Sequence, residues 1–340
     1  MNEWFAVISP ISFLGILILV GFFSEKYGYV TNIRESLSRI IVNITLPVFV
    51  VTSLCSQNLN NISLLNISTV YLSGISAVLV LLIINKFVAK ALKVSNERRL
   101  IHIFLGSFGN VIFLGYPVIF YLYGQIGLLY AIIFSLANDS MVWTYGVYML
   151  KKNCEQKVTQ TSNIIEERGS ILTNNVKSSQ LWNNGFCNAM TLSFIIGISM
   201  LILNIKLPDI INNPLVRLGE ATIPLSMLFI GAILAKTNLL ASVTQLSIWV
   251  LALIKMILLP IIVLLSVKLF ASNISDTLII IVPVICLQIA MPTQINLSVL
   301  AEKYKADTVY VAQTIFVTTI ASALTLPLIY FLCVMFFPIQ

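Results

Sequence analysis

Long apolar segments separated by short polar interruptions constrain the fold of this chain more than any other feature. A bilayer core of about 30 Å is crossed by roughly 20 apolar residues in an α-helix. Of the residues, 58% are hydrophobic and 10% are charged, and the mean hydropathy is +0.97. We therefore predict an all-α integral membrane protein. Cutting the chain at its polar interruptions predicts ten transmembrane helices, over residues 4–23, 37–56, 69–92, 101–123, 126–150, 186–204, 214–235, 243–269, 277–301 and 308–336.

The composition argues against several other classes of protein. The five cysteines stand singly, which indicates neither a disulfide framework nor a thiolate metal site. One histidine and few carboxylates form no catalytic or metal-binding pattern, so we expect no enzyme, metal or cofactor. The net charge of +7 lies mostly in loops, where it reports topology rather than a nucleic-acid partner. The first apolar segment lacks the basic start of a signal peptide and is interpreted as a membrane span.

Basic residues are concentrated in every second predicted loop. Of the 20 lysines and arginines, about sixteen fall in odd-numbered loops and only Lys206 and Lys268 in even-numbered ones. Because basic loops remain in the cytoplasm, this bias places both chain termini outside the cell. The polar segment 151–185 mixes Ser, Thr, Asn and charges without an apolar period, and is expected to be a cytoplasmic linker.

The two halves of the chain resemble each other. Pro47 in RIIVNITLP precedes Pro117 by 70 residues, and Pro224 in RLGEATIP precedes Pro292 by 68. This spacing predicts two five-helix repeats, residues 1–150 and 186–340, on either side of the linker. Five is an odd number, so the second repeat enters the membrane from the opposite side, as in many transporters.

Helix-breaking residues interrupt the fourth and ninth predicted helices. The fourth contains FGNVIFLGYPVIF, residues 108–120, and the ninth contains AMPTQINL, residues 290–297. An interior proline removes a backbone hydrogen bond, and lipid does not satisfy the groups left open. We therefore expect both helices to be broken near mid-membrane, to face protein or water there, and to cross.

The predicted direction of the two helices favours an anion at the breaks. In each, a second half-helix would begin with proline in its first turn, leaving the amides of Val118, Ile119, Thr293 and Gln294 free. Two helix starts would supply about one positive charge. The polar side chains could instead form hydrogen bonds between helices. The predicted substrate-binding residues are Asn110, Gly115, Tyr116, Pro117, Val118, Pro292, Thr293, Gln294 and Asn296.

Two charged residues fall within predicted spans. An ionised Asp139 in the fifth helix would cost about 3 kcal/mol unless it is paired, hydrated or protonated. Lys255 in the eighth helix is a candidate partner. The two could form a structural charge pair, or Asp139 could bind a coupling proton or cation. His102 adjoins the basic third loop and is expected to remain solvated.

Several motifs resemble the auxin efflux carrier family, whose bacterial members are often described as malate or malonate permeases. These are GNVIFLGYP followed by YLYG, AMPTQINLSVLAEKYKAD, LSRIIVNITLP and GEATIPLSMLFIGAILA. The resemblance implies a ten-helix inverted-repeat fold and a bacterial inner membrane location. It also implies a scaffold of the first two helices of each repeat and a transport domain of the other three. Asn110, Pro117 and Pro292 would line the substrate site. The short linker and Asp139 depart from plant hormone exporters, which argues against auxin itself.

These patterns predict a secondary transporter of a small organic anion, a carboxylate such as malate, malonate or an auxin-like acid. It would work by alternating access, through an elevator or rocking motion. The alternative is an anion channel or a membrane ligand sensor that uses the same site. Either function accommodates a homodimer, and uptake would require a coupled proton or sodium ion.

Overall fold

The computed structural model describes residues 2–29, 33–56, 63–146, 148–149, 189–235, 244–270, 276–295, 297 and 306–337. Within these ranges all named elements are helical and no strand is formed. The described residues contain six helical stretches that are long and apolar enough to cross a membrane, together with two shorter apolar helices. This agrees with the predicted all-α membrane protein, whereas the ten-helix inverted arrangement stays a prediction.

The first three predicted segments correspond to helices of the structure. The first and third are covered by α1 (Asn2–Lys26) and α4 (Leu64–Ala91). The second is divided among α2 (Ile33–Ile40), the π-helical η1 (Ile41–Thr45) and α3 (Leu46–Cys55). A π-helical turn widens a helix locally, so these three form one continuous span from Ser36 to Cys55.

The fourth predicted segment is interrupted upstream of its proline. Helix α5 (Asn96–Ser107) ends before residues 108–114, here named the first break, and α6 (Gly115–Met141) begins after them. Helix α6 continues through the predicted fourth loop. It changes direction at Gly124, whose φ of 61° and ψ of −153° are open to glycine alone. The π-helical η3 (Val142–Gly146) follows.

The second half contains another series of helices. They are α9 (Ala189–Ile202), α10 (Asp209–Glu220), α11 (Thr222–Ala235), α13 (Leu246–Leu253), the π-helical η4 (Ile254–Leu258), α14 (Leu259–Phe270), α15 (Asp276–Ala290) and α17 (Thr308–Phe336). Residues 291–295 after α15 are not helical and are named the second break. The predicted linker at 151–185 and Asn296 lie outside the described residues.

Polar side chains define two helix starts. Ser63 accepts a hydrogen bond from the Leu65 amide at 3.2 Å and begins α4. Asp307 accepts one from the Tyr310 amide at 2.9 Å and begins α17. Such caps satisfy amides that have no partner in the first turn of a helix.

One group of helices is built around α1, α3, α9, α10 and α11. Helix α1 packs along α11, and α3 packs against α9 and α10. A Cβ atom at Gly21 would overlap the backbone of Leu228, and one at Gly231 would overlap the backbone of Ile18. The two glycines therefore let α1 and α11 approach more closely than larger residues would allow, as is common between membrane helices.

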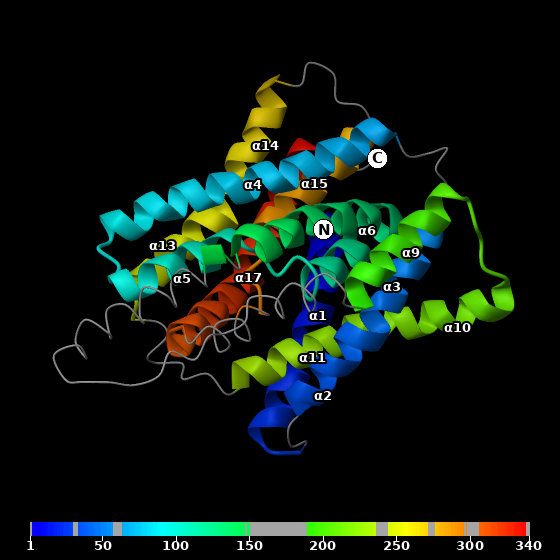
Figure 1. Ribbon diagram of the computed structural model, residues 1–340, viewed down its shortest axis with the longest axis horizontal. Coiled ribbons are helices and arrows are strands. Elements are labelled where there is room, and N and C mark those ends of the chain that lie inside the picture. Colours follow the sequence, from blue (N-terminus) through cyan, green and yellow to red (C-terminus); the bar gives the residue numbers. More distant parts are fainter. Residues whose placement is uncertain are drawn as a thin grey trace, which may run out of the picture.

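The remaining long helices form a second group. Helix α4 packs against α5 and α6, and α15 packs against α6, α14 and α17. Figure 1 shows α4, α13, α14, α15 and α17 on one side of the molecule and α2, α3, α9, α10 and α11 on the other. Helix α6 contacts both groups, through α4 and α15 in one and α1 and α3 in the other. Both chain breaks flank helices of the second group.

Candidate binding site at the two chain breaks

The two breaks lie against each other and pair as short antiparallel segments. Gly109 and Thr293 form an isolated antiparallel β-bridge. The Asn110 amide donates to the Pro292 carbonyl at 2.7 Å, and the Gln294 amide donates to the Phe108 carbonyl at 3.3 Å. Backbone groups that lipid would leave unsatisfied are therefore satisfied between the breaks. This contact brings together residues of the predicted fourth and ninth helices.

The two prolines do not occupy equivalent positions. Pro117 is the third residue of α6, within its first turn, as predicted. Pro292 instead lies inside the second break, where its carbonyl accepts the bond from Asn110. The prediction that Pro292 occupies the first turn of a half-helix is therefore wrong, because residues 293–295 are not helical.

The predicted free amides are also occupied. The Val118 amide donates to the Leu114 carbonyl at 3.2 Å, because helical winding begins before Gly115. The Thr293 amide donates to Thr318 Oγ1 at 3.2 Å, and Gln294 is bonded to the first break as described above. In the described chain, the turn at residues 111–114 has no backbone acceptors for its amides. The amides without a backbone acceptor at the start of α6 therefore belong to the residues directly after Asn110.

Three buried amide side chains beside the breaks have polar atoms without a hydrogen-bond partner among the described residues. Asn110 is 1% exposed, and neither its Oδ1 nor its Nδ2 is bonded. Gln288, also 1% exposed, donates from Nε2 to the Ala131 carbonyl at 3.4 Å, but its Oε1 is unpartnered. Gln294 Oε1 is likewise unpartnered. Each such group costs about 1–3 kcal/mol when buried, so their gathering at one place calls for a functional reason.

The residues at the start of α6 have different roles. A Cβ atom at Gly115 would lie 2.6 Å from Gln288 Oε1, so glycine is required for the amide of Gln288 to approach. The buried Tyr116 hydroxyl is hydrogen-bonded to Ser135 Oγ on the same helix. Its polar atom is therefore engaged within α6. Val118 is buried and contributes apolar surface.

Lys255 lies at the first break. Its side chain is 1% exposed, and its ammonium donates a hydrogen bond to the Phe108 carbonyl, which also accepts from Gln294. It is carried by the π-helical segment η4, and such segments occur frequently at functional sites. The positive charge is thus held beside the paired breaks by a backbone carbonyl.

Two amide side chains connect the Asp139 carboxylate to the paired breaks. Asn138 Oδ1 accepts from the Gly109 amide at 3.4 Å, while Asn138 Nδ2 donates to Asp139 Oδ1 at 3.2 Å. The Gln294 side chain lies within hydrogen-bonding range of the Asp139 carboxylate. In the part of the chain that is described, no ion pair joins Asp139 to Lys255. Each charge instead contacts the breaks separately.

Three residues beside the breaks, Gln288, Thr318 and Asn138, are not among the predicted site residues, and the environment of His102 differs from the predicted one. Gln288 could have been found as the one amide in the apolar run of α15, a single turn before Pro292. His102 was expected to be solvated, but it is fully buried, with Nδ1 2.7 Å from the Tyr310 hydroxyl.

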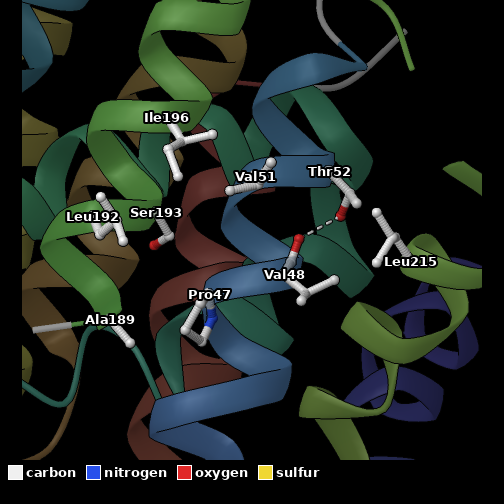
Figure 2. A pocket seen from close by; sticks show the side chains of 9 residues that line it. All are labelled: Pro47, Val48, Val51, Thr52, Ala189, Leu192, Ser193, Ile196 and Leu215. Carbon is white, nitrogen blue, oxygen red and sulfur yellow. Dashed lines mark hydrogen bonds between the residues drawn. The ribbon is translucent and has the colours of Figure 1, made fainter. Parts of the chain in front are cut away.

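A separate cavity of about 300 Å³ lies between α3, α9 and α10. Figure 2 shows Val51 and Ile196 lining it from α3 and α9, with Leu215 on α10. The Thr52 hydroxyl there donates to the Val48 carbonyl at 2.9 Å. No charged side chain lines this cavity, so it lacks the electrostatics of the paired breaks.

The described residues contain no group of His, Cys, Asp and Glu side chains that could hold a metal ion. The arrangement at the breaks instead consists of amide groups, open backbone donors, the Lys255 ammonium and the Asp139 carboxylate.

Comparison with known proteins identifies the family. No curated protein matches the sequence. A family model described as membrane transport protein matches residues 6–330, almost the whole chain. The match includes both breaks and every residue described around them. The chain therefore belongs to the membrane transport protein family, the family of the auxin efflux carriers.

Proposed function

We propose that this membrane transport protein is a secondary transporter of a small organic anion, bound at the paired breaks. The observation that carries the proposal is the buried side chain of Asn110. Its two polar atoms lack partners in the described chain, and the open amides of residues 111–114 follow it in the first break, whose Phe108 carbonyl contacts the Lys255 ammonium. A carboxylate would accept hydrogen bonds from these donors and would balance the buried charge.

The substrate class follows from the donors. A planar carboxylate has two oxygens that accept several hydrogen bonds, so malate, malonate or an auxin-like acid fits the chemistry. The proposed substrate-contacting residues are those of the two breaks, with Gln288 added.

We propose alternating access as the mechanism, on a ten-helix inverted-repeat fold. The helices around α1, α3 and α11 would form the scaffold, and those around α4, α6, α15 and α17 would carry the substrate. The separate packing of the two groups supports this division. Asp139 is the candidate for a coupled proton or sodium ion, because it reaches the breaks through Asn138 and Gln294.

Flux measurements in proteoliposomes test this function. Purified protein should accumulate a labelled carboxylate when a membrane potential, proton gradient or sodium gradient is imposed, and ionophores should abolish the accumulation. A potential of 100 mV supplies about 2.3 kcal/mol per charge. Flux that only equilibrates the anion, at rates far above carrier turnover, would favour a channel. Saturable binding without any flux would favour a ligand sensor.

A further inference from the structure

A cluster of polar side chains joins the amino-terminal ends of α5, α13 and α17. We name it the Tyr310 clamp, and its members are Arg98, His102, Ser247, Asp307 and Tyr310. His102 lies six residues before Phe108, which is about 9 Å along a helix. The clamp is therefore close to the first break but has no member in it.

Tyr310 is the centre of the clamp. Its hydroxyl lies 2.7 Å from His102 Nδ1 and 3.3 Å from Ser247 Oγ, so one group connects α17 with both α5 and α13. Tyr310 is 1% exposed and His102 is fully buried. Hydrogen bonds between helices in such an environment contribute about 0.6 kcal/mol on average and up to about 2.

Arg98 adds a charged contact at the outer edge of the clamp. Its Nε donates to Asp307 Oδ2 at 2.7 Å, and its guanidinium carbon lies 5.3 Å from the centre of the Tyr310 ring. Asp307 Oδ1 also accepts the Tyr310 amide and caps α17. The start of α17 is therefore fastened to α5 by two side chains one turn apart, Arg98 and His102.

Helix α5 needs such a restraint because the first break separates it from α6. Backbone hydrogen bonds of a continuous helix would fix its rotation and its height, but the last of them in α5 is donated by the Phe108 amide to the Phe104 carbonyl. A slip of one residue would move α5 by 1.5 Å and rotate it by about 100°. That displacement would separate the hydrogen bonds of 2.7 Å and 3.3 Å between the two breaks.

The same two helices hold the second break. The Thr293 amide donates to Thr318 Oγ1 on α17 at 3.2 Å, and the Thr293 hydroxyl donates to the Leu105 carbonyl on α5 at 3.1 Å. Thr318 lies eight residues after Tyr310, and Leu105 lies three after His102. The relative height of α5 and α17 therefore decides whether Thr293 can make both bonds.

We propose that Tyr310 and His102 are positioning residues for the anion site. They hold α5 in register with α17, and this register places Thr293 and the first break. The consequence for anion affinity rests on the proposed function, whereas the consequence for the position of α5 does not.

A double-mutant cycle tests the proposal. The variants Tyr310→Phe and His102→Leu both remove the bond between Tyr310 and His102, while Tyr310→Phe also removes the bond to Ser247 and keeps the ring beneath Arg98. Each variant should raise the Kd for a carboxylate about fivefold. The Kd of the double variant should not exceed the higher of the two single-variant values, because the effects of substituting two contacting residues are not additive. Loss of folded protein would lower the number of binding sites and leave Kd unchanged. Tyr27→Phe, at a 67% exposed tyrosine, is the matched control.

Hydrogen exchange of the same full-length variants gives a readout that does not depend on any ligand. Amides of residues 96–107 should exchange faster in Tyr310→Phe than in the parent and in Tyr27→Phe, since local opening becomes easier. Unchanged exchange in α5 overturns the proposal, and so do additive losses of affinity. If the parent binds no carboxylate, the anion-binding function fails, while exchange in α5 still decides the positioning role. If His102→Leu does not fold, Tyr310→Phe alone decides it.

Discussion

The backbone amide of Asn110 donates a 2.7 Å hydrogen bond to the carbonyl of Pro292, while the side chain of Asn110 has no partner in the described chain. One residue thus fastens the two breaks together and leaves a buried amide open beside them. Backbone pairing accounts for the stability of the breaks, so the open side chain is available for binding.

Replacing the Asn110 side chain should reduce binding without reducing stability. In Asn110→Leu, an unpartnered polar group is exchanged for an apolar one of similar size, so the melting temperature should stay the same or rise. Carboxylate affinity should fall about tenfold, which corresponds to about 1.4 kcal/mol. Thermal shift and equilibrium binding measure the two effects. Asn213→Leu, at an exposed asparagine of α10 far along the chain from both breaks, should leave affinity unchanged.

Removing the charge of Lys255 should weaken anion binding strongly. Lys255→Met keeps the length of the side chain, and the Phe108 carbonyl retains its bond from Gln294. We expect Kd for a carboxylate to rise at least tenfold, because a buried charge interacts strongly with an anion. Lys268→Met provides the control, since that exposed lysine lies over the Phe336 ring. Equal affinity in the two variants would remove Lys255 from the site.

Adding a methyl group at Gly115 should disturb the site through Gln288. The new Cβ would lie 2.6 Å from Oε1 at the flexible end of the buried Gln288 side chain, so the amide must shift, at the lower end of the about 1–3 kcal/mol typical of overpacking. Unfolding of Gly115→Ala should therefore occur at lower temperature. Combining it with Gln288→Ala should restore stability but not affinity. Gly15→Ala meets no atom within 4 Å and serves as the control; a similar loss there would contradict the steric explanation.

Neutralising Asp139 should separate coupling from binding. Asp139→Asn retains the shape and an acceptor oxygen for Asn138 and removes a negative charge near the breaks, so carboxylate affinity should stay the same or rise. If Asp139 carries the coupling ion, stimulation of uptake by an imposed proton or sodium gradient should disappear. Parallel flux measurements with each gradient in proteoliposomes decide this. Gradient stimulation that persists in the variant would assign coupling elsewhere.

The sequence predicted the location of both breaks but not the hydrogen bonds that satisfy their backbone amides and carbonyls. Gly115 and Pro117 mark where α6 begins, because glycine and proline act locally on the backbone. The break itself begins earlier, at Phe108, since proline is favoured after a helix start and does not mark the preceding helix end. A charged residue inside an apolar segment is also recognisable from the sequence alone, and Lys255 is predicted in this way as a charge within a span.

The sequence contains no comparable local pattern that predicts contacts between distant segments. Pairing of Gly109 with Thr293 depends on how two helices cross, and the sequence of neither break specifies its partner. For the same reason the amides of Thr293 and Gln294 were expected to be free. His102 follows a basic loop and was expected in water, but Tyr310, from the last long helix, buries it.

Binding of a radiolabelled carboxylate to the purified protein tests the central claim most directly. The paired breaks predict saturable binding at one site per chain, about tenfold weaker in Asn110→Leu, at least tenfold weaker in Lys255→Met, and unchanged in Asn213→Leu and Lys268→Met. Absence of saturable binding across malate, malonate and aromatic carboxylates would contradict the anion site, as would equal affinity in all four variants.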